Sequence, residues 1–175
     1  MFSLVSIVLM FSLGSLAYME SLPDGCYLGE GNWSNTDNFS SYYQTYIKFQ
    51  TNEMHTDYVW SDAQSSVNIS FLFNGQGWFD VVFGGNVVGA GFCMQYQCSY
   101  DMDINGIHYG ETLSFYTNSL HKLGHKRVGT RLSRWEEILV KLNDNNPPST
   151  DPFPPLNPIN LDVASQGAFG PLPVN

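Results

Sequence analysis

The chain has 175 residues, with 7 lysines and arginines against 16 aspartates and glutamates, which gives a formal net charge of −9. This length suits a single domain with a sizeable core, and the 43% hydrophobic and 15% aromatic content excludes wholesale disorder. Proteins that bind nucleic acid through its phosphates need many cations, so the acidic composition argues against a nucleic-acid partner.

The first seventeen residues have the pattern of an export signal. Residues 2–13 are almost wholly apolar, and Ser15-Leu16-Ala17 then supplies the small residues that a signal peptidase reads. The apolar run is short for a bilayer span of about 20 residues. We therefore predict a signal peptide at residues 1–17, a secreted or extracytoplasmic protein, and no stable membrane span after cleavage.

Between residues 26 and 128 apolar residues alternate with polar ones, which is the period of half-buried strands. The clearest stretches are 43–49, 54–60, 67–73, 79–83 and 98–104. Turn residues separate them, and Asn105-Gly106 is the strongest hairpin signal because a type I′ turn needs positive φ at both central residues. We predict a mainly β fold of eight or nine antiparallel strands, closed into an up-and-down barrel that leaves no exposed sheet edge.

A single C-terminal α-helix is expected after the strands. Ser133-Arg134-Trp135-Glu136 matches a capping box, and Trp135, Ile138, Leu139 and Leu142 follow helical spacing. Barrel and helix together are expected to span residues 18–142. The remaining residues, 143–175, hold eight of the nine prolines and are expected to form a disordered tail.

Six of the seven basic residues lie within residues 122–141. They could form a docking face for an anion such as a lipid headgroup. They could also simply neutralise an otherwise acidic barrel. We favour this second interpretation because exposed charges are usually solvated.

Gly31-Asn32-Trp33 on the first strand, the strand meander, the basic last strand and the C-terminal helix resemble a lipocalin-type member of the calycin superfamily. The first strand is also similar to that of avidins in Cys26-Tyr27-Leu28, Gly31, Trp33 and Asn35. The lipocalin resemblance implies that Trp33 closes the barrel floor under an arginine, for which Arg127 and Arg131 are both candidates. It also implies that the protein binds small hydrophobic molecules.

The Asn105-Gly106 turn sets the register of the strands on either side of it, and places Tyr100 opposite Glu111 on the apolar face. Glu111 is therefore expected to point into the barrel, where an unpaired carboxylate is costly. It could contact a polar group of a ligand, or it could be satisfied internally by Tyr100 or an arginine. The candidate ligand-binding residues are Tyr43, Tyr58, Trp60, Phe71, Phe73, Tyr100, Tyr109 and Glu111.

We find no catalytic, cofactor or metal motif in the sequence. His108 faces Asp103 across the predicted hairpin, but no serine or cysteine nucleophile motif accompanies the pair. His121 and His125 share a face, and two ligands are too few to define a zinc site. We therefore predict no enzyme activity, no cofactor and no bound metal, and leave the oligomeric state open.

Three functions fit these patterns. The leading one is a secreted barrel that binds a small apolar or aromatic ligand. The alternative is a barrel filled by its own side chains, which acts through its surface as an envelope structural protein, an inhibitor or an adhesive module. The third is a barrel isomerase or cyclase that uses Glu111 and its tyrosine neighbours.

The three cysteines predict one disulfide bond. Cys93 and Cys98 can pair only if residues 94–97 form a hairpin loop, which also places Gly91 opposite Tyr100. A single strand from 87 to 104 would be longer than the usual three to ten residues. We predict a Cys93–Cys98 bridge across this hairpin, with Cys26 as a buried thiol.

Overall fold

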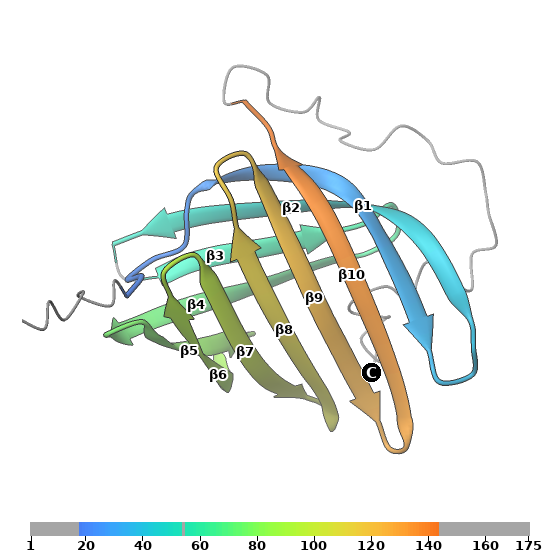
Figure 1. Cartoon of the computed structure of the whole chain (residues 1–175). Helices are drawn as coiled ribbons and strands as arrows, with labels where there is room; N and C mark the ends of the chain where they lie inside the picture. The colour runs from blue at the N-terminus through green and yellow to red at the C-terminus, as the bar shows by residue number, and fades with distance from the viewer. Residues whose placement is uncertain (1–17, 54, 144–175) are drawn as a thin grey trace, which may run out of the picture.

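A computed structural model of the chain describes residues 18–53 and 55–143. They form ten antiparallel strands joined by short connections, in which each strand pairs with the next along the chain (Figure 1). The strands are β1 (Gly25–Asn35), β2 (Ser40–Asn52), β3 (His55–Ser61), β4 (Ser66–Gly75), β5 (Trp78–Phe83), β6 (Asn86–Met94), β7 (Gln97–Ile104), β8 (Ile107–Phe115), β9 (Ser119–Val128) and β10 (Arg131–Lys141).

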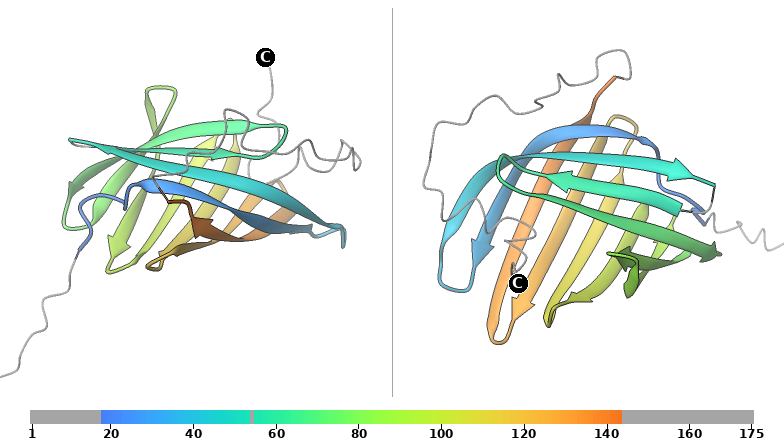
Figure 2. Two further views of the ribbon diagram at one scale, coloured as in Figure 1. Left: turned by 90° about the horizontal axis from the view of Figure 1, so that it is seen from above. Right: turned by 180° about the vertical axis from the view of Figure 1, so that it is seen from behind.

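Pairing of β10 with β1 closes the sheet into a barrel. In Figure 1, β8, β9 and β10 cross in front of β2, β3 and β4, and the view from above in Figure 2 separates these two walls. Closure gives each of the ten strands a neighbour on both sides, so that no strand stands at a free edge of the sheet. The predicted closed up-and-down barrel is confirmed, with ten strands in place of the expected eight or nine.

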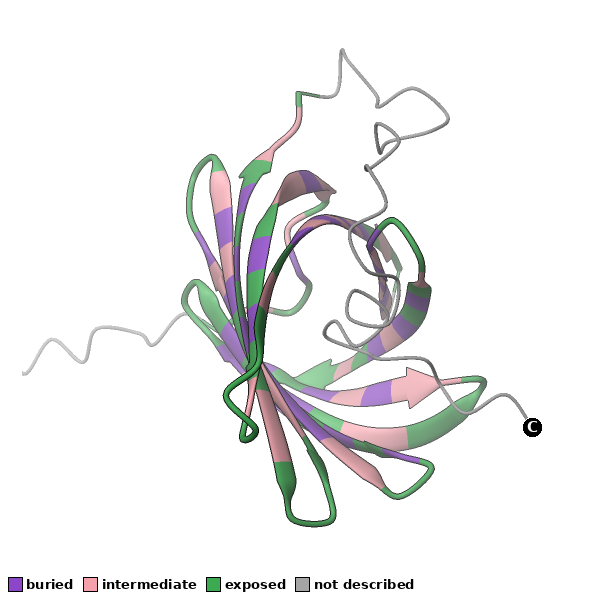
Figure 3. Ribbon diagram, turned by 90° about the vertical axis from the view of Figure 1, so that its right-hand side faces the viewer, coloured by how far each residue is buried: buried purple, intermediate pink, exposed green. Residues whose placement is uncertain are grey.

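Side chains alternate between the barrel interior and the outer face, as the sequence pattern predicts. In β7 every second residue is buried and the residues between are exposed, and the same alternation bands the strands in Figure 3. The buried face is rich in aromatic residues, among them Trp60, Tyr58 and Phe71, none of which is measurably exposed. The core of the protein is therefore the barrel interior.

Two predicted hairpins are confirmed. Asn105 and Gly106 both have positive φ, and the register across their turn places Tyr100 opposite Glu111. Cys93 and Cys98 are directly opposed on β6 and β7 and form a disulfide bond. The third cysteine departs from the prediction. Cys26 is free but only half-buried, and its Sγ accepts a hydrogen bond of 3.0 Å from the hydroxyl of Tyr46.

The predicted C-terminal helix is wrong, because its residues form β10. Trp135, Glu137 and Leu139 alternate into the interior, whereas Ile138 and Val140 are 62% and 60% exposed on the outer face. Local spacing also fitted a helix, but only a strand here pairs with both β9 and β1 and closes the sheet. Long-range pairing therefore overrides the local pattern.

The segment before β1 covers one end of the barrel. Leu22 is buried there, its N–H donates to Thr56 Oγ1 at 3.4 Å, and its carbonyl accepts from Thr51 Oγ1 at 3.1 Å. We call this the Leu22 end, and we call the opposite end, where β1 finishes and β10 begins, the Trp33 end. Hairpin turns surround both ends, and the segment before β1 crosses the Leu22 end in addition.

In the described part of the chain, no helix is long and apolar enough to cross a membrane. The predicted signal peptide, residues 1–17, and nearly all of the predicted proline-rich tail, residues 144–175, lie outside the described residues.

Candidate functional site

A cluster of three ionisable side chains lies inside the barrel, contributed by three consecutive strands. Lys122 on β9 extends its amine to within 3.0 Å of Glu111 Oε1 on β8 and 3.3 Å of Glu137 Oε2 on β10. None of the three side chains is exposed. We call Glu111, Lys122 and Glu137 the interior triad.

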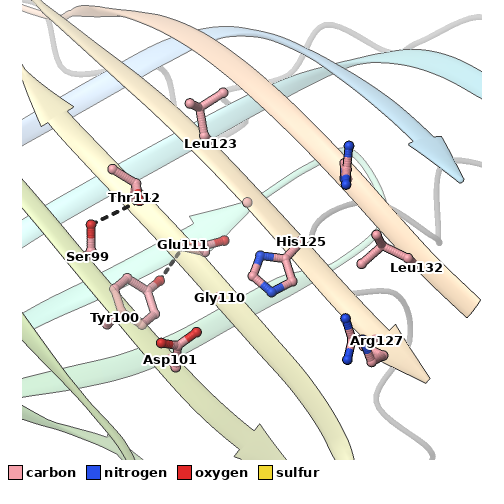
Figure 4. Close-up of a pocket in the computed structure, with 12 residues that line it drawn as sticks. Ser99, Tyr100, Asp101, Gly110, Glu111, Thr112, Leu123, His125, Arg127 and Leu132 are labelled. Atoms are coloured by element: carbon pink, nitrogen blue, oxygen red, sulfur yellow. Dashed lines mark hydrogen bonds between the residues drawn. The ribbon is translucent and has the colours of Figure 1, made fainter. Parts of the chain in front are cut away.

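Aromatic residues supply the remaining polar contacts of the interior triad. Glu137 Oε1 accepts hydrogen bonds from the Tyr43 hydroxyl at 2.7 Å and from Trp60 Nε1 at 3.1 Å. The hydroxyl of Tyr100 donates to Glu111 Oε2 (Figure 4). The triad is therefore held from both walls of the barrel, because these aromatic residues come from β2, β3 and β7.

Burial controls the proton affinity of this site. It raises the pKa of Glu111 above the ordinary value, and the nearby charges and hydrogen bonds of Lys122 and Tyr100 oppose this only in part. Burial also raises the pKa of Tyr43 and of Tyr100 well above the ordinary range, and the neighbouring carboxylates raise both further. The tyrosines are therefore neutral hydrogen-bond donors at physiological pH.

A chain of aromatic rings continues from the triad through the interior. Tyr58 stacks on Phe49 at 5.3 Å and on Phe71 at 5.8 Å between ring centroids. Phe71 also meets Tyr100 edge-on at 5.1 Å. The triad therefore lies in a surrounding that is otherwise almost wholly apolar, where the electrostatic interactions of its charges are strong.

The structure places the predicted ligand-binding residues on the inner wall. Seven of the eight are buried, and Phe73 is only partly buried, where it packs against the core near the end of β4. The sequence found Glu111 but missed Lys122, which it counted among surface charges, and Glu137, which it placed in the helix. Their signal was the period of two in Leu120, Lys122 and Gly124 and again in Trp135, Glu137 and Leu139.

Trp33 is buried at the opposite end from Leu22, and its cross-strand partner is Trp135. The lipocalin resemblance implied an arginine over Trp33, but Arg127 and Arg131 are both exposed. Arg127 lies on the outer face opposite His108, so its side chain points away from the interior. The ring of Trp135 lies over Gly124 of β9, where a Cβ would be only 2.2 Å from its nearest atoms.

Both indole nitrogens at this end are buried without a hydrogen-bond partner in the described part of the chain. Buried donors of this kind are uncommon in native proteins and call for an explanation, such as a bound molecule or water. Lys126 also points inward, and it lies closer to the rim of the barrel than Trp135 does. Its cross-strand partner is Tyr109, and burial lowers the pKa of its amine.

The outer face carries a groove of about 400 Å³ over β7, β8, β9 and β10 (Figure 4). Polar and charged side chains line it, including Asp101, His125, Arg127 and Arg134. Burial lowers the pKa of His125, and the neighbouring His108 lowers it further. Two further hollows, one of about 590 Å³ beside the β4–β5 turn and one of about 320 Å³ near the end of β10, also lie outside the barrel interior.

No protein-family model matches the sequence, and no curated protein matches it. Several solved structures share the fold, among them the following three. A DUF3598-family protein of unknown function from Nostoc punctiforme has a TM-score of 0.58 at 10% identity, over 71% of this chain and 51% of that chain. Rv2717c from M. tuberculosis has a TM-score of 0.54 at 11% identity, over 68% and 92%. The S-type phycobiliprotein lyase CPES from Guillardia theta has a TM-score of 0.55 at 8% identity, over 69% and 89%.

At these identities the likeness establishes the fold alone. The protein is a closed antiparallel β-barrel of the same general kind as these three proteins. It spans only about half the length of the Nostoc protein, as the 51% coverage shows.

Proposed function

We propose that the protein binds a small, mainly apolar or aromatic molecule inside the barrel, and that a polar group of this molecule is recognised by the interior triad. The observation that carries the proposal is the burial of two carboxyl groups and one amine among aromatic rings. Taking each charge out of water costs several kcal/mol, and well-packed apolar residues in its place are often at least as stabilising. A triad at this depth therefore suits a binding role better than a purely structural one.

Two further observations support binding. The indole N–H groups of Trp33 and Trp135 are buried donors without partners among the described residues, and a ligand acceptor would satisfy them. The aromatic wall suits a flat apolar body, because offset and edge-on ring contacts are favourable. In this proposal the wall consists of Tyr43, Tyr58, Trp60, Phe71, Phe73, Tyr100 and Tyr109, and Glu111 contacts the polar group.

Location and family belong to the same proposal. The Cys93–Cys98 bridge is compatible with an oxidising compartment, which supports export through the predicted signal peptide. A closed antiparallel meander and a buried Trp33 in Gly31-Asn32-Trp33 support membership of the calycin superfamily. One of the solved structures with this fold is a phycobiliprotein lyase; for this chain we propose binding alone.

A second candidate is a filled barrel that acts through its outer surface. The observation in its favour is that the rings of Trp60, Tyr58 and Phe71 are completely buried against their neighbours. Glycines on the inner wall fit this view, because a Cβ at Gly91 would lie 2.3 Å from the Phe79 ring and the ring occupies that space. A direct binding measurement separates the two candidates.

The test uses the disulfide-bonded protein and the fluorescent cation thioflavin T, which combines a flat apolar body with a positive charge that a carboxylate can bind. Binding in the barrel predicts saturation at one dye per chain, with quenching of tryptophan fluorescence. Glu111→Gln should weaken binding about tenfold, which corresponds to about 1.4 kcal/mol. Lys48→Met, on the outer face of β2, is the control that removes a lysine without touching the triad and should bind like wild type.

Extraction of the purified protein with organic solvent, followed by mass spectrometry, extends the test to a ligand retained from the source. Failure of the dye to saturate, together with an empty extract, would favour the filled barrel. Equal loss of binding in Glu111→Gln and Lys48→Met would place the dye outside the interior.

A further inference from the structure

Three potential metal ligands meet on the outer face of the barrel. Asp101 on β7, His108 on β8 and His125 on β9 each offer one ligand atom, and these atoms all lie within 4.8 Å of one another. The three residues are separated by 7 and 17 positions in the chain, so only the register of β7, β8 and β9 brings them together. Asp101 and His125 line the groove of about 400 Å³ described above.

Gly110 makes room for this convergence. It lies directly between Asp101 and His125 in the sheet, next but one to His108 along β8 (Figure 4). A Cβ on Gly110 would lie 2.4 Å from His125 Cε1 and 2.6 Å from Asp101 Oδ1. The φ of Gly110 is not in the left-handed region, so the backbone does not require glycine here. In this arrangement the side chains of Asp101 and His125 occupy the space that a Cβ would take.

The orientation of His108 suits a metal ligand. Its Nδ1 lies 3.3 Å from Asp103 Oδ1, and its Nε2 lies 3.5 Å from Asp101 Oδ1. A proton on Nδ1 bonds to Asp103 and leaves the lone pair of Nε2 directed toward Asp101. Metal-bound histidines almost always donate their second ring nitrogen to a carboxylate or carbonyl in this way.

The distances fit a tetrahedral ion. Zinc binds histidine nitrogen and carboxylate oxygen at about 2.0–2.2 Å, which separates neighbouring donor atoms by about 3.4 Å. The distance of 3.5 Å between His108 Nε2 and Asp101 Oδ1 already matches. The ligand atom of His125 lies within 4.8 Å of the other two. A small rotation of the His125 side chain would therefore bring it to the third corner of the tetrahedron.

We propose that Asp101, His108 and His125 form a zinc site on the outer face of the barrel, with Asp103 orienting His108. Two imidazoles and one carboxylate are a ligand set that zinc accepts, and they leave a fourth position open. That position opens into the groove that Arg127 and Arg134 line. The positive charge of the two arginines suits an anion or a hydroxide as the fourth ligand.

The test is calorimetric titration of zinc chloride into the tag-free protein after treatment with EDTA, since a polyhistidine tag would bind zinc itself. We expect one zinc per chain. Asp103→Asn should weaken binding about tenfold, as for other residues that orient a metal-bound histidine. His125→Asn removes a ligand and should weaken binding by more than that.

Gly110→Ala provides a test in which all ligands remain. Its Cβ takes the space where Asp101 and His125 approach, so it should weaken zinc binding like the loss of a ligand. His121→Asn is the matched control, because His121 also lies on β9 but pairs with Glu136 at 2.8 Å and not with the cluster. Cys26→Ser controls for binding to the free thiol. Both controls should bind zinc like wild type.

Circular dichroism would confirm that each variant remains folded. Wild-type protein that takes up no zinc would overturn the proposal. So would a Gly110→Ala variant that binds like wild type, or a His121→Asn variant that loses as much affinity as His125→Asn.

Discussion

Lys122 and Glu137 are direct cross-strand partners on β9 and β10, and their side chains meet at 3.3 Å inside the barrel, where neither is exposed. The same amine lies 3.0 Å from Glu111, so one positive charge serves two carboxyl groups. When both carboxyl groups are ionised the cluster carries a net negative charge, and a proton on one of them makes it neutral. Electrostatic interactions are strong in the low-dielectric interior, so the stability of the protein should depend on the charge of this cluster.

Replacing Lys122 by methionine should strongly destabilise the protein. Methionine has a similar length and fits an apolar surrounding, but it leaves Glu111 and Glu137 without their cation. Removing one partner of a buried ionic group typically costs about 3–5 kcal/mol, and we expect a loss in this range from urea denaturation. Lys48→Met is the surface control and should change stability by less than about 0.5 kcal/mol.

A triple variant shows whether the cost comes from unpaired charge. Lys122→Met combined with Glu111→Gln and Glu137→Gln removes all three charges together. It should recover much of the lost stability, because replacing a whole buried ionic cluster is often neutral or stabilising. If the triple variant were less stable than Lys122→Met alone, packing and not charge would explain the loss.

Glu111 should make stability depend on pH. Burial raises its pKa above the ordinary 4.5, so the folded protein retains a proton that the unfolded chain has already released. The stabilisation from this group is complete below pH 4.5 and is lost as the pH rises through the folded pKa. Glu111→Gln stays neutral throughout and lacks this contribution.

The measurement is the free energy of unfolding of both proteins from pH 4 to pH 8. Wild-type stability relative to Glu111→Gln should fall with rising pH above 4.5, by no more than about 1.4 kcal/mol per pH unit. It should become constant once the pH exceeds the folded pKa. A relative stability that rises over this interval would mean that Lys122 and Tyr100 outweigh the effect of burial.

Local signals in the sequence were sufficient for part of the site. The Asn105-Gly106 turn fixed the pairing of Tyr100 with Glu111, because a two-residue hairpin leaves one register for the strands that flank it. The direction of Glu111 into the barrel follows from that register and from the strand period alone. The opposition of Cys93 and Cys98 could also be predicted, because one unbroken strand here would be unusually long and because the two cysteines are five positions apart.

The partners of Glu111 could not be predicted in this way. Residues 133–142 fit a helical stripe and a strand about equally well, and only pairing with β1, about a hundred residues earlier in the chain, decides for the strand. With Glu137 assigned to a helix, nothing indicated that Lys122 faces inward. The meeting of His108 with His125 and Asp101 likewise depends on the register of β8 with β9, for which the sequence has no two-residue turn like Asn105-Gly106.

The disulfide bond should contribute modestly to stability. Cys93 and Cys98 are separated by five positions, and closing so short a loop is worth about 2 kcal/mol in the chain-entropy model. Replacing both by alanine should reduce the free energy of unfolding by about that amount, with a further cost from the space vacated by the buried sulfurs.

Reduction provides the control for the bridge. A reducing agent should lower the stability of wild type but leave the double alanine variant unchanged, since Cys26 takes no part in the bridge. Peptide mapping without reduction should find Cys93 linked to Cys98. A linkage from Cys26 to either cysteine would contradict the structure.

The Trp33 end of the barrel should depend on both of its tryptophans. Trp33 and Trp135 are 2% and 3% exposed and face each other across β1 and β10, and Trp33 also packs on Phe39 at 5.7 Å. Truncating either to alanine leaves a large cavity next to the strand pair that closes the barrel. We expect each variant to lose about 3–5 kcal/mol in urea denaturation, as for other buried aromatic residues.

Trp78 is the matched control for these variants. It lies on β5 and is 55% exposed, so Trp78→Ala removes the same side chain from the outer face and should cost under about 1.5 kcal/mol. Because Trp33 and Trp135 are neighbours, the double variant should cost less than the sum of the single changes. An unchanged melting temperature in Trp33→Ala would contradict both the burial of this residue and its role in closing the barrel.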